Sequence, residues 1–295
     1  MNSGGLFRTN WSYLMWFAFN FSLSLLFVNI IMQDFSYALA IVLLLYVITL
    51  LIAFSSLGER IIRNSLKIRP LKTLGEKEQL LPIFDEVYKD AKKLTPSLSN
   101  NVSLYILEEM EINAFAVGSN TIVITKGAIL GLSSNALRGL IAHEFGHIAH
   151  GDTKALLLTQ VGNGFFSFMT WLVDVFIRIS VFIVSRRKDT EYVLWVIKAI
   201  CGVLRFVIWI IKGIGNIIIP LNSRYSEHLA DSYAIRLGYS DGLITSLKTM
   251  YKISPDSIRG TIDRIKMSHP YTLDRIERIE NQDGLSIQGS VGEVK

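Results

Sequence analysis

His143, Glu144 and His147 have the types and the spacing that zinc hydrolysis needs, because together they form the pattern HExxH. Residues four apart lie on one face of a helix, so both imidazoles can bind a single Zn²⁺. Glu144 then lies beside the metal, where it can act as a general base on a water held by the ion. The pattern therefore predicts hydrolysis at one catalytic zinc centre.

A third ligand must come from elsewhere, because catalytic zinc usually keeps three protein ligands and one open position. His150 lies only three residues after His147 on the same helix, and the extended pattern HExxHxxGxxH is broken at His150 and Thr153. Glu227 is the better candidate, in a segment of helical character. Asp231, four residues later, can hydrogen-bond the far nitrogen of a ligand histidine and fix its tautomer.

Long apolar segments surround these residues. The chain of 295 residues is 50% hydrophobic and has a mean hydropathy of +0.37, which is too apolar for an ordinary soluble enzyme. Segments 11–32 and 37–57 each hold about 20 residues, enough to cross a bilayer core of about 30 Å. Residues 11–57 are therefore predicted to form a transmembrane hairpin. A signal peptide is disfavoured because a second span follows at once.

The charges beside this hairpin predict its orientation. The turn 33–36 has no Lys or Arg, whereas residues 58–72 carry five basic side chains against one Glu. The positive-inside rule then places the N-terminus and the chain after residue 58 in the cytoplasm. The net charge of +5 comes partly from this basic flank, and we attribute it to membrane topology. No nucleic-acid partner is expected. The single Cys201 excludes an intramolecular disulfide.

Residues 58–152 are expected to be cytoplasmic and to lead to the HExxH helix. Apolar side chains at helical spacing predict an amphipathic helix over 73–95. A small antiparallel β-meander follows, with strands at 102–107, 112–117 and 121–125. Ser133 or Ser134 is expected to cap the HExxH helix, and Gly151 to end it.

Residues 113–118, which begin with Asn113 and overlap the middle strand, are the candidate edge of this sheet. An edge strand beside a zinc site can bind an extended peptide by strand addition. The alternative is an ordinary interior strand.

Residues 153–221 hold two further apolar segments, about 155–185 and 192–221. Each is about 30 residues long, or roughly 45 Å as a helix, and a hairpin here would return Glu227 to the zinc helix. The basic loop 186–191 opposes a crossing. Charges also lie within the segments, at Asp174, Arg178, Lys198, Arg205 and Lys212. Either the pair spans, with its charged face lining a hydrated chamber, or it inserts only partly; we favour spanning.

The motifs together resemble the HtpX-type membrane zinc metalloproteases, relatives of the type 1 CAAX prenyl proteases. The runs 143–152 and 223–231 carry the resemblance. Residues 113–116 resemble the family's substrate-aligning strand, and residues 268–279 resemble its C-terminal His-Pro helix. The resemblance implies a mainly α membrane protein, with transmembrane helices and a cytoplasmic gluzincin-like protease domain. Residues 222–280 would form cytoplasmic helices, and the polar tail 281–295 is expected to be disordered.

The same resemblance implies roles for two further residues. His269 would help to hold the substrate carbonyl or the oxyanion, although a helix-cap role before Pro270 is an alternative. Arg275 would pair with Asp231. The implied function is endopeptidase action on misfolded or damaged membrane proteins at the cytoplasmic face of the cell or inner membrane, in quality control and stress response.

Two alternative functions can each be weighed against this one by a single feature of the sequence. A CAAX-type processing protease would need a large prenyl-accommodating chamber, which the few spans disfavour. A non-catalytic zinc-bound scaffold would not need Glu144, which is present. The expected partners are polypeptides, chiefly membrane proteins, and the lipid bilayer. Self-cleavage and association with other membrane proteases stay open.

Overall fold

The structure is a computed structural model that describes residues 11–184, 191–218, 223–253 and 272–292. Its elements fall into two units, which are described separately. One unit contains the HExxH motif and is built from residues 51–157 and the chain after residue 220. The other is built from residues 12–50 and 158–219.

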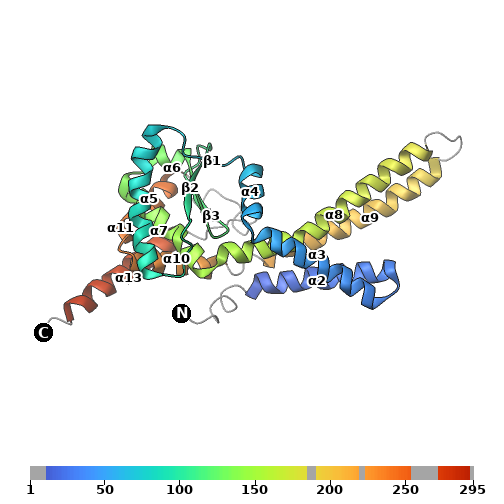
Figure 1. Ribbon diagram of the computed structural model, residues 1–295, viewed down its shortest axis with the longest axis horizontal. Coiled ribbons are helices and arrows are strands. Elements are labelled where there is room, and N and C mark those ends of the chain that lie inside the picture. The colour runs from blue at the N-terminus through green and yellow to red at the C-terminus, as the bar shows by residue number, and fades with distance from the viewer. Residues whose placement is uncertain (1–10, 185–190, 219–222, 254–271, 293–295) are drawn as a thin grey trace. The chain divides into compact units, whose positions relative to one another are not determined.

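Helix α7 (Ser134–His150) carries the HExxH motif and lies within the first unit (Figure 1). Its neighbours are α5, α10, α11 and strand β3. The described elements of this unit, besides α7, are α4 (Ser56–Ser65), α5 (Leu74–Leu94), α6 (Lys126–Gly131), α10 (Ser223–Arg236), α11 (Ser240–Ile253), α13 (Thr272–Gly292) and four strands, β1 (Arg69–Pro70), β2 (Ser103–Leu107), β3 (Ala114–Val117) and β4 (Thr121–Thr125). Helix α5 corresponds closely to the amphipathic helix predicted over 73–95.

The ends of α7 agree with the sequence prediction. The Ser133 hydroxyl accepts the N–H of Ala136, which satisfies one of the unpaired donors at the helix start. Gly151 ends the helix in the left-handed region, with φ of 79°. Between the caps, Phe145 packs against Phe84 and Tyr88 of α5, with ring centroids 5.7 and 5.6 Å apart. This apolar packing fixes α7 in the core and leaves its histidines facing α10.

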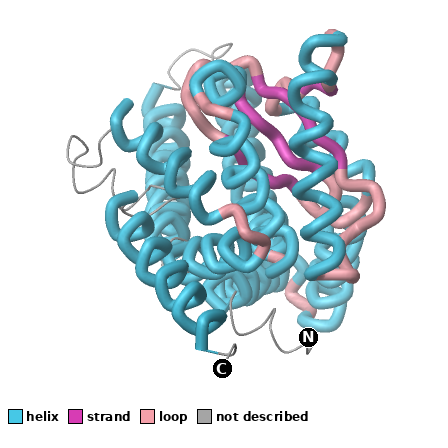
Figure 2. Tube along the Cα trace, turned by 90° about the vertical axis from the view of Figure 1, so that its left-hand side faces the viewer, coloured by secondary structure: helices cyan, strands magenta, loops and turns pink. Residues whose placement is uncertain are grey.

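The four described strands form one sheet beside the helices (Figure 2). This sheet is mixed, so the predicted antiparallel meander is wrong. The strand order is β1-β2-β4-β3, with β2 parallel to β4 and β3 antiparallel to β4. Every residue of β4 is buried, and a strand covered on both faces commonly occupies the centre of a sheet. The meander prediction assumed that consecutive strands pair, whereas β3 lies beyond β4. Among the described strands β3 is at the edge, as expected.

The second unit consists of long apolar helices. These are α2 (Trp11–Met32), α3 (Phe35–Ala53), α8 (Asp152–Val184) and α9 (Glu191–Ile218), of which α2, α3 and α8 each have terminal residues that belong to the first unit. Tyr46 of α3 contacts α2 through edge-to-face packing on Phe17 and Phe21, and its hydroxyl lies 2.9 Å from Ser24 Oγ. Arg205 of α9 donates to Asp174 of α8. The two helices of each pair therefore meet through specific contacts.

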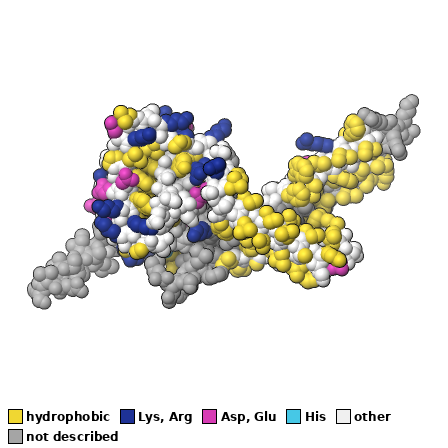
Figure 3. All heavy atoms as spheres, viewed as in Figure 1, with side chains coloured by type: hydrophobic (Ala, Val, Ile, Leu, Met, Phe, Trp, Pro, Cys, Tyr) yellow, Lys and Arg dark blue, Asp and Glu magenta, His cyan; other side chains and the backbone are white. Residues whose placement is uncertain are grey.

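Three of the described helices are long and apolar enough to cross a membrane, at Leu14–Met32, Phe35–Ala53 and Tyr192–Ile210. Hydrophobic side chains gather along α2, α3, α8 and α9 (Figure 3). Within the described residues α8 does not meet the same criterion, so the crossing expected for 155–185 stays a prediction. At the C-terminus the structure differs from the expected disorder, because α13 continues to Gly292.

Candidate active site

Three side chains from two helices converge in the first unit. His143 and His147 come from α7, and Glu227 comes from α10. The two Nε2 atoms are 3.2 Å apart. His143 Nε2 lies 3.3 Å from Glu227 Oε2, and His147 Nε2 lies 3.4 Å from Glu227 Oε1. The three residues thus form a buried or half-buried cluster that could hold a metal ion.

The size of this cluster fits zinc. Ligand atoms at about 2.0–2.1 Å from a tetrahedral ion are separated from one another by roughly 3.3 Å. The two Nε2 atoms are separated by 3.2 Å, and each imidazole has one oxygen of Glu227 at a similar distance, Oε2 at 3.3 Å from His143 and Oε1 at 3.4 Å from His147. Two imidazoles and one carboxylate also make a donor set that zinc prefers.

A carboxylate lies behind each histidine. His143 Nδ1 is 3.0 Å from Asp231 Oδ1, and His147 Nδ1 is 2.9 Å from Asp152 Oδ2. When each Nδ1 donates its hydrogen to its carboxylate, the neutral imidazole presents a lone pair at Nε2. Two lone pairs would then face each other across 3.2 Å, which is favourable only with a cation between them. The geometry therefore suits a metal, or a proton in its place.

The histidines attract protons for the same reason. Burial lowers the pKa of His147, but hydrogen bonds to Asp152 and Glu227 outweigh burial and raise that pKa well above 6.5. For His143, burial and the charge of Arg275 are likewise outweighed by Asp231 and Glu227, and the pKa is raised.

The buried charges around the cluster are predominantly negative. Among the residues that the structure describes, four buried carboxylates meet one buried guanidinium, that of Arg275; the acids are Glu144, Asp152, Glu227 and Asp231. Arg275 donates to both oxygens of Asp231 over 2.9 and 2.6 Å and lies 3.1 Å from Glu227 Oε2. Although burial raises the pKa of Asp231, the charge of Arg275 helps to bring that pKa well below its usual range. Burying such an excess of negative charge is costly without a further cation.

Gly146 lets α10 come close enough to α7 to complete the cluster. A Cβ at residue 146 would lie 2.7 Å from Ala230 Cα, too near for a real contact. Because Glu227 and Asp231 flank Ala230 on α10, this close helix contact determines how far both carboxylates reach toward the histidines.

The structure places most of the predicted site residues together. Glu144 is buried on α7 next to His143, and Arg275 pairs with Asp231 as the resemblance implied. Asn113 lies immediately before β3, and its main chain makes two hydrogen bonds with Thr125. The Asn113 N–H donates to the Thr125 hydroxyl over 3.0 Å, and the Asn113 carbonyl oxygen accepts from the Thr125 N–H over 3.1 Å. His269 lies outside the described residues. His150 is not part of the cluster, since its Nδ1 lies 2.7 Å from the carbonyl oxygen of Gly146.

Asp152 is a site residue that the sequence patterns did not predict. This residue follows the helix break at Gly151, and helical spacing from His147 does not predict its position. Its second oxygen accepts a hydrogen bond from Ser226 over 3.3 Å, so it also contacts the segment that carries Glu227. The available signal was the acid itself, five residues after a predicted ligand histidine.

Comparisons with known proteins agree with this site. A family model described as peptidase family M48 matches residues 77–283. The chain is 28% identical over 227 residues to the Protease HtpX homolog of Bacillus licheniformis, covering 71% of each chain. It is 30% identical over 218 residues to Protease HtpX of Shewanella denitrificans, covering 68% of this chain and 73% of that protein.

A solved structure, the crystal structure of Ste24p from S. mikatae, is also similar, at 16% identity and a TM-score of 0.47. The match covers 88% of this chain and 61% of that chain. Because the family model covers well over half of the residues and includes both helices of the cluster, the chain belongs to peptidase family M48 and is a metalloprotease.

Proposed function

We propose that this protein is a membrane-bound, zinc-dependent endopeptidase in which His143, His147 and Glu227 hold one catalytic zinc ion. The observation that carries the proposal is the cluster of ligand atoms, in which the two Nε2 atoms lie 3.2 Å apart and each lies 3.3–3.4 Å from one of the two oxygens of Glu227, backed by Asp231 and Asp152. Zinc at this position would polarise the scissile carbonyl and make a water molecule a stronger nucleophile near neutral pH.

Glu144 performs the proton transfer in this proposal. Its carboxylate accepts a proton from the attacking water and delivers it to the nitrogen of the leaving amine. Burial of Glu144 at 2% exposure keeps bulk water away from this transfer. Asp231 and Asp152 hold the two imidazoles in the tautomer that presents Nε2 to the metal.

Strand β3 and Asn113 align the polypeptide substrate. The outer edge of β3 is not paired with another described strand, and β3 lies against α7. A substrate in extended form can add to that edge, so that its backbone runs beside the metal.

The proposed substrates are polypeptides, chiefly misfolded or damaged membrane proteins, cleaved on the cytoplasmic side. Three apolar helices support attachment to a membrane, and the basic residues at 58–72 support cytoplasmic placement of the HExxH unit. The relatives named as HtpX proteases support a role in stress response.

The proposal is tested with detergent-purified wild type and Glu144→Gln. Bound zinc and cleavage of unfolded casein are measured for both, with and without a chelator. We expect zinc in both proteins and chelator-sensitive cleavage in the wild type alone, with at least about a 10²-fold loss in the variant. Zinc in both with equal cleavage would exclude Glu144 as the base, and zinc without cleavage in either would favour a scaffold.

A further inference from the structure

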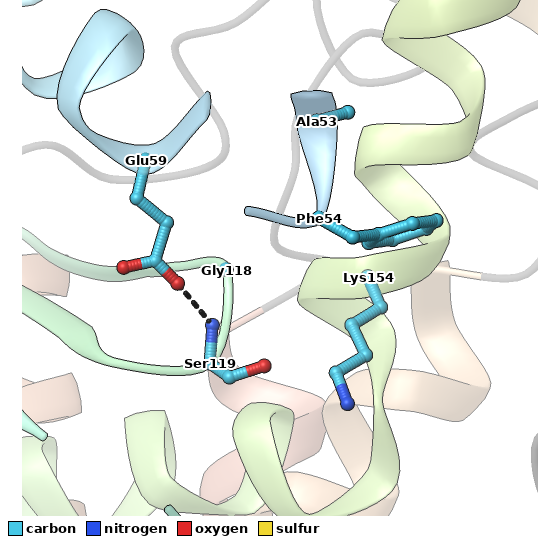
Figure 4. Close-up of a pocket in the computed structure, with 6 residues that line it drawn as sticks. All are labelled: Ala53, Phe54, Glu59, Gly118, Ser119 and Lys154. Atoms are coloured by element: carbon cyan, nitrogen blue, oxygen red, sulfur yellow. Dashed lines mark hydrogen bonds between the residues drawn. The ribbon is translucent and has the colours of Figure 1, made fainter. Parts of the chain in front are cut away.

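The turn at residues 118–120, which follows β3, is held by a buried carboxylate from α4 (Figure 4). The Ser119 N–H donates to Glu59 Oε1 over 2.9 Å, and the Thr121 hydroxyl lies 3.4 Å from Glu59 Oε2. Glu59 is 60 residues from Ser119 in sequence and only 7% exposed. A buried carboxylate is costly unless it is paired, so its placement against this turn needs an explanation.

Gly118 and Arg63 make that contact possible. Gly118 has a φ of 61°, and a Cβ there would lie 2.3 Å from Glu59 Oε1. Arg63 lies 3.5 Å from Glu59 Oε2 and donates to the Thr121 hydroxyl over 3.0 Å. The turn therefore has a shape that suits the acid from α4, and the charge of that acid is balanced by Arg63 of the same helix.

A second buried side chain holds the same turn from α8. The Thr153 hydroxyl donates to the carbonyl oxygen of Gly118 over 2.5 Å. Thr153 directly follows Asp152, whose carboxylate contacts His147 and Ser226 at 2.9 and 3.3 Å. The turn that ends β3 is thereby connected to both helices of the metal cluster.

We infer that Glu59 and Thr153 are positioning residues that hold the end of β3 in register with the metal cluster, and so determine how tightly an extended polypeptide binds. This inference rests on the proposed function, in which β3 adds a substrate strand. Open space beside the turn allows it to shift when either contact is lost. That hollow, of about 250 Å³, is lined by Ala53, Phe54, Glu59, Gly118, Ser119 and Lys154.

The expected effect is on binding more than on chemistry. Backbone hydrogen bonds between β3 and an added substrate strand would form in the bound substrate and persist in the transition state. Losing interactions that stabilise both states equally raises KM and leaves kcat unchanged. Neither Glu59 nor Thr153 is among the residues that would contact the metal.

The test compares Glu59→Gln, Thr153→Val and Thr153→Ser with the wild type. KM and kcat are measured on unfolded casein, together with bound zinc. Thr153→Val loses the hydroxyl donor, and Glu59→Gln keeps an acceptor but loses its charge and the ion pair with Arg63. For both variants we expect KM to rise about tenfold, comparable to the contribution of one hydrogen bond to a charged or buried partner. We expect kcat to stay within about twofold and zinc content to be unchanged. Thr153→Ser keeps the hydroxyl and should restore KM.

Lys154→Ala is the matched control, because Lys154 lines the same hollow but is exposed and holds no part of the turn. Its KM should equal that of the wild type. The inference would be overturned if kcat fell in Glu59→Gln and Thr153→Val while KM stayed unchanged. It would also be overturned if KM rose as much in Lys154→Ala or Thr153→Ser as in those two variants. If Glu59→Gln loses zinc or fails to fold, the comparison of Thr153→Val with Thr153→Ser tests the inference by itself.

A second arm separates this inference from the proposed function. Each substitution is repeated in the Glu144→Gln background, and the Kd for fluorescently labelled unfolded casein is measured with zinc bound. The proposed function would be refuted if the wild type did not cleave casein and if adding a chelator changed none of its measured properties. The Kd series would still show whether Glu59 and Thr153 control polypeptide binding, and an unchanged Kd in both variants would refute that role.

Discussion

His147 and Asp152 are joined across the break between α7 and α8, with Nδ1 and Oδ2 2.9 Å apart. The left-handed Gly151 lets the chain turn between them. As a result, the acid that orients one ligand histidine comes from the start of the next helix, while the acid that orients the other, Asp231, comes from α10.

Asp152→Asn should weaken zinc binding by about 10–100-fold, as substitution of such an orienting acid typically does. The amide is a weaker acceptor for the His147 Nδ1 hydrogen, so the imidazole is held less firmly. Zinc affinity is measured by competition with a chelating dye. Asp85→Asn, on an exposed part of α5, removes the same charge elsewhere and should leave the affinity unchanged. Equal affinity in Asp152→Asn and wild type would show that this contact does not orient the ligand.

Local patterns predicted the elements of this fold better than their pairing. HExxH spacing located His143 and His147, and cap chemistry located both ends of α7. Strand pairing was mispredicted because β2 and β3 are neighbours in sequence but not in the sheet, and burial of β4 on both faces is a tertiary property. Asp152 was missed for a similar reason, since its contact depends on the turn at Gly151 and not on a helical repeat.

Removing the metal should lower the thermal stability of the protein. Without a divalent cation, Glu144, Asp152, Glu227 and Asp231 are balanced chiefly by Arg275 among the described residues and by protons taken up on the histidines. At free zinc of about 1,000 times Kd, the bound ion contributes about 4 kcal/mol. Thermal unfolding in detergent with and without chelator measures the effect. His143→Ala should unfold at a lower temperature that the chelator no longer changes, and an unchanged wild-type Tm would contradict a metal at this cluster.

Gly146→Ala should reduce both stability and zinc binding. The added methyl would lie 2.7 Å from Ala230 Cα, so α10 must shift and carry Glu227 with it. Overpacking of this kind costs about 1–3 kcal/mol, more than the gain of about 1 kcal/mol from alanine in a helix. Gly164→Ala is the control, because nothing lies within 4 Å of its added Cβ. Chemical denaturation and zinc content are measured on both; full zinc occupancy in Gly146→Ala would mean that α10 can adjust without moving Glu227.

Tyr239→Phe should destabilise the protein in a manner that depends on pH. The Tyr239 hydroxyl donates to Asp90 Oδ2 over 2.9 Å and thereby connects the chain just before α11 to α5. Hydrogen bonds from Lys93 and then Tyr239 lower the pKa of Asp90 below 3.8. A lowered folded-state pKa means that this stabilisation is fully present above pH 3.8 and is lost as the pH falls through the folded-state value. The variant should therefore be about 0.5–1.5 kcal/mol less stable than wild type near neutral pH, and the difference should shrink below pH 3.8, where protonated Asp90 accepts more weakly.

Urea unfolding of both proteins across this range measures the difference. Tyr225→Phe, which changes a side chain that is 50% exposed, should show no such trend, and a difference for Tyr239→Phe that stays constant below pH 3.8 would show that the charge of Asp90 is not what stabilises this contact.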